Sequence, residues 1–184
     1  MYPVKLGFGE ALNRIRRLLT NGHNAEALVT TVFTIEKTLR RTLKQLIISA
    51  GFSSPKAEKL LKFHQGLFRL IEAWEIYDPQ ERKLSQILSS NDLRTIKTAA
   101  EMRNDLVHGE RAFDLNYCTS VANSAIQALE QIKARLDQEY GYSGWVRMRH
   151  RCFSKLHVDP KVNCPTPGCS VRAAAARAEP SVRR

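Results

Sequence analysis

The segment "LVTTVFTIEKTLRRTLKQLI" (residues 28–47) decides the fold that this sequence predicts. Its apolar residues recur every three or four positions, which is the period of an α-helix with one buried face. They are Leu28, Val32, Ile35, Leu39, Leu43 and Leu46. The turn residues "TNGHN" precede the segment, with Asn24 as a candidate helix cap, and "GFSSP" interrupts the pattern after it. The pattern predicts a long amphipathic helix over residues 25–49.

The same helical period continues on both sides of this segment, from residue 9 to residue 140. Strand-like alternation between hairpin turns does not occur there. The expected helices are one that contains residues 12–19, one over residues 54–77, a short one that begins in "YDPQE", one that begins at "SSND" (residues 89–92) and ends at Gly109, and one from Asp114 to Tyr140. Because loops between them are short, the sequence predicts an all-α, up-and-down bundle of four to five helices.

Positive charge is concentrated at the C-terminal end of the chain. The 184 residues carry a formal net charge of +11, and residues 1–140 hold 20 Lys/Arg against 16 Asp/Glu, whereas residues 141–184 hold 9 against 2. The last part is also rich in Ala, Arg and Pro, a composition typical of disorder. We therefore predict a helical domain over residues 1–143 and a basic, disordered tail over residues 144–184. A basic chain favours polyanions, although a tail that is merely solvated is the alternative.

The N-terminal residues lack the apolar core of a signal peptide, and no apolar run is long enough for a membrane span. The expected location is cytoplasmic, without a membrane partner. The cysteines are then expected as free thiols or metal ligands. Cys152, His157, Cys164 and Cys169 form a possible zinc set, but their spacing matches none of the common zinc patterns. The favoured prediction is therefore no metal and no cofactor.

The stretch "AAEMRNDLVHGE" (residues 99–110) places Arg103, Asn104 and His108 at the end of a predicted helix. An arginine four to six positions before a histidine also occurs in a turn and in the tail, so only the helical setting distinguishes this copy. Asn104 and His108 are four residues apart and share a helix face. Arg103 and His108 are five apart, about 140° around a regular helix. They converge only if the helix ends near His108, which Gly109 permits.

These three residue types suit cleavage of an RNA phosphodiester. An imidazole can remove the proton of a 2′-OH near neutral pH. A guanidinium can hold a phosphate with two hydrogen bonds and stabilise the charge of the transition state. The Asn104 amide can orient either the phosphate or the histidine. The stretch offers no carboxylate cage for a metal ion.

The stretch "RNDLVHG" resembles the motif of the HEPN family, an arginine followed by a polar residue and, four to six positions after the arginine, a histidine. Residues 28–47 also resemble the second helix of that family, in which an apolar helix carries a glutamate, here Glu36. The resemblance covers about residues 9–140 and implies a metal-independent endoribonuclease that homodimerises around one composite cleft. It also implies a role as a toxin or in phage defence, with an antitoxin protein as a possible partner. One branch has a tyrosine two positions after the histidine, where this chain has Glu110, so control by AMPylation is not carried over.

Alternative roles remain open for these residues. Arg103 can pair with Glu101 or Asp105 on the surface, and His108 can simply cap the negative end of its helix. Glu36 can orient Arg103 or His108, or be a boundary residue. The alternative function is a non-catalytic helical adaptor or a nucleic-acid-binding dimer.

Basic residues on two helices are candidates for an RNA-binding surface. The candidates are Arg40, Arg41 and Lys44, together with Arg14 and Arg17. The alternative is that they are the solvated outer faces of bundle helices. The two tryptophans, Trp74 and Trp145, are expected in core and boundary packing.

Overall fold

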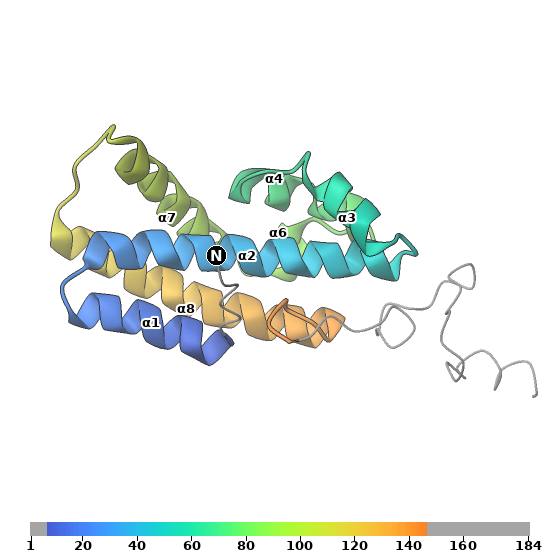
Figure 1. Ribbon diagram of the computed structural model, residues 1–184, viewed down its shortest axis with the longest axis horizontal. Helices are drawn as coiled ribbons and strands as arrows, with labels where there is room; N and C mark the ends of the chain where they lie inside the picture. The colour runs from blue at the N-terminus through green and yellow to red at the C-terminus, as the bar shows by residue number, and fades with distance from the viewer. Residues whose placement is uncertain (1–6, 147–184) are drawn as a thin grey trace, which may run out of the picture.

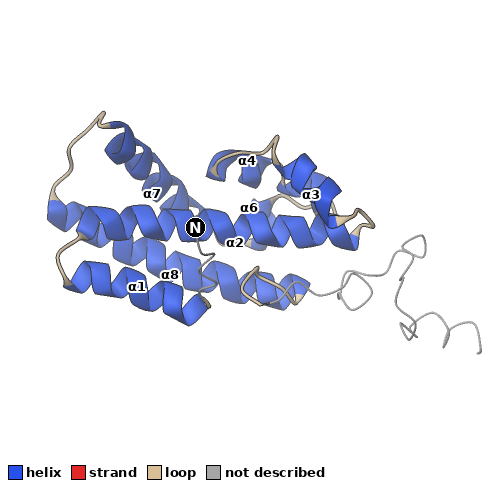
Figure 2. Ribbon diagram, viewed as in Figure 1, coloured by secondary structure: helices blue, strands red, loops and turns tan. Residues whose placement is uncertain are grey.

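The computed structural model describes residues 7–146. Within these residues the chain forms eight helices and no strand, which confirms the predicted all-α class (Figure 2). The four longest are α1 (Phe8–Thr20), α2 (Asn24–Ser49), α7 (Ser90–His108) and α8 (Leu115–Tyr140). The others are α3 (Ser54–Leu61), α4 (Leu67–Glu72), α5 (Trp74–Tyr77) and α6 (Leu84–Ile87).

The central helix is α2, which packs against α8, α1 and α7. Figure 1 shows α1, α2 and α8 running along the long axis, with α3 and α4 beside the C-terminal half of α2. All six residues of the predicted apolar stripe are buried, as expected for a helix with neighbours on several sides. Two small residues of α8, Ala122 and Ala125, are also fully buried. Small side chains of this kind let α8 approach α2 closely.

Four buried threonines lie among the apolar residues of α2. They are Thr31, Thr34, Thr38 and Thr42. Each hydroxyl donates to the backbone carbonyl oxygen four residues earlier, at 2.7 to 3.0 Å. Because these hydrogen bonds satisfy the hydroxyls within the helix, the threonines can be buried without unpaired donors.

The helices α7 and α8 begin and end close to the predicted positions, and side chains cap their N-termini. The Ser89 hydroxyl oxygen accepts from the Asp92 N–H at 3.0 Å, and Asp114 caps α8 in the same way. Gly109 and Gly141 follow the two helices with φ of 68° and 67°, a left-handed conformation that glycine adopts without steric cost. These boundaries confirm the predicted extents of both helices.

The single helix predicted over residues 54–77 is wrong, because the chain divides there into α3, α4 and α5. Residues 62–66 form a turn, and Gly66 leaves it with φ of 82°. A second bend follows at Ala73. The two bends keep α3, α4 and α5 packed along α2, and Leu67, Leu70 and Trp74 are all buried.

The short helix predicted to begin in "YDPQE" begins instead at Leu84. The Asp78 carboxylate accepts hydrogen bonds from the backbone N–H groups of Gln80 and Arg82, at 3.0 and 3.1 Å. Such side-chain bonding replaces helical bonding and stabilises a turn. Residues 78–83 are therefore a loop.

After α8 the chain folds back across α2. Gly144 lies so close to α2 that a Cβ atom there would be 2.6 Å from the Arg41 Cβ. The Arg41 Nη1 donates to the Gly144 carbonyl oxygen at 3.0 Å, and the Trp145 indole N–H donates to the Thr38 hydroxyl at 2.9 Å. The Phe8 ring meets the Trp145 ring edge to face. The predicted boundary after residue 143 falls inside this packed segment, and residues 147–184 of the predicted tail lie outside the described residues.

Candidate functional site

The predicted motif occupies the last two turns of α7. Figure 1 shows this end of α7 diverging from α2 toward the loop that leads into α8. His108 is the last residue of the helix and is exposed, whereas Arg103 and Asn104 are half-buried. The backbone N–H of Glu110 donates to the Asp105 carbonyl oxygen at 2.9 Å and completes the helix end. The helix therefore ends where Gly109 predicted, directly after His108.

Arg103 makes a contact that joins α7 to α2. Its Nη2 donates to the Glu36 Oε2 at 3.4 Å, and both side chains are about one-quarter exposed, 26% and 23%. The sequence leaves open whether Glu36 contacts Arg103, contacts His108 or is only a boundary residue. In the structure Glu36 contacts Arg103. It has no ion pair of Arg103 with Glu101 or Asp105 among the described residues.

The pair of Arg103 and Glu36 is incomplete. Arginine–carboxylate pairs are commonly bidentate, with N···O distances of about 2.7 to 2.9 Å. Here one long hydrogen bond is formed, and the buried Arg103 Nε has no hydrogen-bond partner within residues 7–146. A buried donor without a partner costs roughly 1–3 kcal/mol. The guanidinium therefore retains donors that its own chain does not use.

Within one chain, Arg103 and His108 do not meet. Because α7 stays helical through His108, the two side chains leave it about 140° apart. No hydrogen bond joins them in the described part of the chain. Asn104 and His108 do share a face, as the spacing predicts. A single copy thus has Arg103 on the α2 side of α7 and His108 at the helix end, apart from each other.

Exposed apolar side chains lie near this end of the bundle. Val107 is next to His108 and 58% exposed, and Phe33, one turn before Glu36 on α2, is 62% exposed. Leu115 and Tyr117, in the first turn of α8, are also exposed. These exposed apolar side chains lie on three helices, α2, α7 and α8, and exposed apolar side chains are candidates for contact with another protein.

A second polar cluster lies at the opposite end of α8. The Asp78 side chain is fully buried, and it accepts from the Tyr140 hydroxyl at 2.5 Å and from the Arg82 Nε at 3.2 Å. Tyr140 in turn accepts from the Trp74 indole N–H at 3.0 Å, and Arg82 also pairs with Glu139. Every member has a partner, so the cluster is a closed structural network.

The titration behaviour of this network follows from its contacts. Burial alone would raise the pKa of Asp78, but the hydrogen bonds from Arg82, Tyr140 and two backbone N–H groups hold that pKa below its ordinary value. Burial, followed by the hydrogen bond to Asp78, raises the pKa of the Tyr140 hydroxyl. Perturbed groups often mark active sites. Although Asp78 is among the residues that line the neighbouring cavity, its side chain is fully buried and its carboxylate is hydrogen-bonded to Arg82, Tyr140 and the backbone, so we interpret the cluster as structural.

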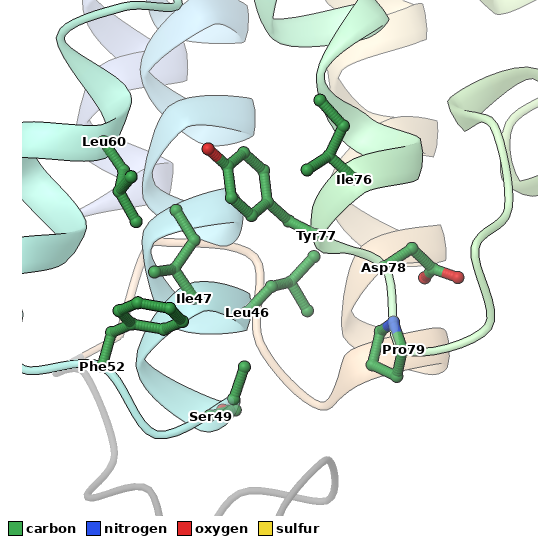
Figure 3. Close-up of a pocket in the computed structure, with 10 residues that line it drawn as sticks. Leu46, Ile47, Ser49, Phe52, Leu60, Ile76, Tyr77, Asp78 and Pro79 are labelled. Atoms are coloured by element: carbon green, nitrogen blue, oxygen red, sulfur yellow. The ribbon is translucent and has the colours of Figure 1, made fainter.

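An apolar cavity of about 630 Å³ lies beside this network, at the C-terminal end of α2 (Figure 3). Figure 3 shows Leu46, Ile47, Phe52 and Leu60 gathered around the Tyr77 ring. The Tyr77 hydroxyl is within 3.2 Å of the His64 Nε2. The cavity begins ten residues beyond Glu36, about 15 Å along the axis of α2. It therefore lies apart from the motif and does not include it.

The predicted RNA-binding residues of α2 line a different, half-open cavity. Arg40, Arg41 and Lys44 share it with Glu58 and Leu61 of α3 and with Lys62, the residue after α3. Sequence reasoning missed Glu58 and Lys62, although their four-residue spacing places them on one helix face.

Further expectations concern metals, thiols and membranes. Cys118 is a buried free thiol, and no cluster of three or more potential metal ligands occurs among residues 7–146. Cys152, His157, Cys164 and Cys169 lie outside the described residues. None of the described helices combines the length and the apolar character needed to cross a membrane.

The chain matches no protein-family model, no curated protein and no solved structure.

Proposed function

We propose that the chain is a metal-independent endoribonuclease of the HEPN type. The observation that carries the proposal is Arg103, whose part-exposed guanidinium makes one long hydrogen bond to Glu36 and lies on the same helix end as His108. An arginine that can bind an anion and a histidine at a helix end are suited to hold and cleave an anionic ester when a second copy brings the two together.

The proposed reaction uses the 2′-OH of the RNA as its nucleophile. The imidazole of His108 removes the 2′-OH proton, and the 2′ oxygen forms a bond to phosphorus. The bond from phosphorus to the 5′ oxygen breaks, and that oxygen takes up a proton. Arg103 stabilises the additional negative charge on the phosphate, and Asn104 orients the phosphate or the imidazole. The products are a 2′,3′-cyclic phosphate and a 5′-OH.

A second copy of the chain completes the proposed site. Because Arg103 and His108 leave α7 in different directions, two copies that meet at this end can combine an arginine and a histidine in one cleft. The exposed Val107 and Phe33 beside the motif support this arrangement. Val107→Glu is expected to convert a dimer into a monomer and to abolish cleavage, as measured by sedimentation and by an RNA cleavage assay. A Val107→Glu protein that remains dimeric and active would contradict the arrangement.

The cleavage test uses end-labelled RNA in the presence of EDTA. Wild-type protein is expected to give cyclic phosphate ends, and His108→Ala is expected to lower the rate by about 10²–10⁴-fold. Because His108 is exposed, its replacement should leave the fold intact. Products with a 5′-phosphate would overturn the proposed chemistry.

A non-catalytic nucleic-acid-binding dimer is the second candidate. The observation in its favour is the ion pair between Arg103 and Glu36, because it uses one of the guanidinium's N–H donors within the single chain. This candidate predicts RNA binding that weakens with salt and is indifferent to His108→Ala, with no cleavage in either protein.

A further inference from the structure

A cavity of about 340 Å³ between α2 and α3 is lined mainly by cationic side chains. Its lining residues are Arg40, Arg41, Lys44, Glu58, Leu61 and Lys62. Four positive charges thus surround one carboxylate. A concave site with this excess of positive charge concentrates anions.

Two of the cations are held in place by backbone carbonyl oxygens. The Arg40 Nη1 donates to His64 at 3.4 Å, and the Arg41 Nη1 donates to Gly144 at 3.0 Å. Each guanidinium has five N–H donors, so these contacts fix the side chains while leaving donors for a ligand. Fixed arginines lose less conformational entropy when they bind an anion.

Glu58 marks the place where an anion can bind. Its carboxylate forms an ion pair with Lys44. The hydrogen bond from Lys44, followed by the charges of Lys44, Lys62 and Arg40, lowers the pKa of Glu58. Several cationic side chains thus attract the Glu58 carboxylate, and they would attract a phosphate group in the same way. Glu58 is 63% exposed, so its side chain can move aside for a ligand.

We infer that this cavity binds a phosphate group and that, in the proposed ribonuclease, the group belongs to the RNA chain next to the cleaved bond. The assignment to RNA rests on the proposed function. Glu36, Arg40 and Lys44 recur every four residues and share one face of α2. The cavity therefore begins one helical turn, about 6 Å along the axis, from the Arg103 contact. A free nucleotide is the other source of the same phosphate chemistry.

The test measures binding in a His108→Ala background, so that failure to cleave cannot be mistaken for failure to bind. The probes are a short fluorescent single-stranded RNA, followed by anisotropy, and inorganic pyrophosphate, followed by calorimetry. Lys44→Gln and Lys62→Gln are expected to weaken RNA binding about tenfold, and each should reduce the salt slope by about 1. Glu58→Gln should tighten binding, because it removes the competing charge. Lys83→Gln, on the loop before α6, is the matched control and should change nothing.

Two results would overturn the inference. If Glu58→Gln and Lys62→Gln bind both probes as the control does, the cavity is not a phosphate site. If these variants alter pyrophosphate binding and leave RNA binding unchanged, the ligand is a free phosphate compound and the assignment to RNA is wrong. Since Glu58 and Lys62 are exposed, their variants should fold even if Lys44→Gln does not.

Discussion

The bundle contains two polar clusters that tie its helices together, and they differ in how completely they are paired. At one end, the fully buried Asp78 carboxylate accepts from Tyr140, Arg82 and the backbone. Toward the other end, Arg103 and Glu36 are each about one-quarter exposed and share a single hydrogen bond of 3.4 Å. Both clusters place charge between helices, yet only the first satisfies all its members.

This difference separates stability from function. A closed, buried network stabilises the fold. Because each of its polar groups already has a partner, a ligand could bind there only by breaking those hydrogen bonds. An incompletely paired arginine contributes little to stability, because part-exposed ion pairs are worth at most about 1 kcal/mol. Such an arginine can exchange its partner for a phosphate. The account therefore predicts opposite mutational phenotypes for the two clusters.

The largest effect is expected at Asp78. Asp78→Ala leaves Arg82 and the Tyr140 hydroxyl without their buried partner, which should lower the free energy of unfolding by about 3–5 kcal/mol. Urea denaturation measures this loss. RNA cleavage per folded molecule should be unchanged. A loss below about 1 kcal/mol would show that the cluster is not structural.

Part of the contribution of Asp78 to the free energy of unfolding should depend on pH. Because the pKa of Asp78 is lowered in the folded state, its charged form stabilises the protein above the unfolded pKa of about 3.9. This contribution is lost as the pH falls through the lower, folded pKa. The difference in unfolding free energy between wild type and Asp78→Asn should therefore shrink on acidification below about pH 4. A difference that does not change with pH would contradict the shift.

A smaller effect is expected at Glu36, as a positioning residue for Arg103. Glu36→Leu should lower the cleavage rate about tenfold and change unfolding by less than about 1 kcal/mol. Glu36→Gln retains an acceptor for the Arg103 Nη2 and should restore most of the rate. If the leucine and glutamine variants have equal rates, Glu36 does not act through this hydrogen bond.

An effect on stability alone is expected at Gly109, which ends α7. Gly109→Ala meets no atom within 4 Å, so its cost comes only from the positive φ of 68° and should be about 1–2 kcal/mol. Gly9→Ala is the matched control, since Gly9 lies in α1 with equally open space and should gain about 0.5–1 kcal/mol. Equal melting temperatures for both variants would contradict the role of Gly109.

The sequence was sufficient to predict the features that depend on local patterns. The apolar stripe of α2, the starts of α7 near Ser89 and of α8 near Asp114, and the ends of both helices all follow from spacing and residue type. The division of residues 54–77 was not predictable, because a straight helix there has an acceptable period. Only packing against the core selects the bends at Gly66 and Ala73.

The polar contacts depend on residues far apart in the chain. Tyr140 and Asp78 are separated by 62 positions, and Arg103 and Glu36 by 67. The spacing of Arg103, Asn104 and His108 indicated on which face of the helix each side chain lies. It did not indicate which of them contacts Glu36. The cavity of Arg40 and Lys44 likewise depends on where α3 lies, which no local pattern specifies.

The most direct test of the account compares the rate of RNA cleavage by wild type and by the Arg103→Ala, His108→Ala double variant, both with EDTA present. The account predicts cleavage by the wild type, loss of cleavage in the double variant, and an unchanged free energy of unfolding. Cleavage at the full rate by the double variant, or abolition of wild-type activity by EDTA, would contradict it.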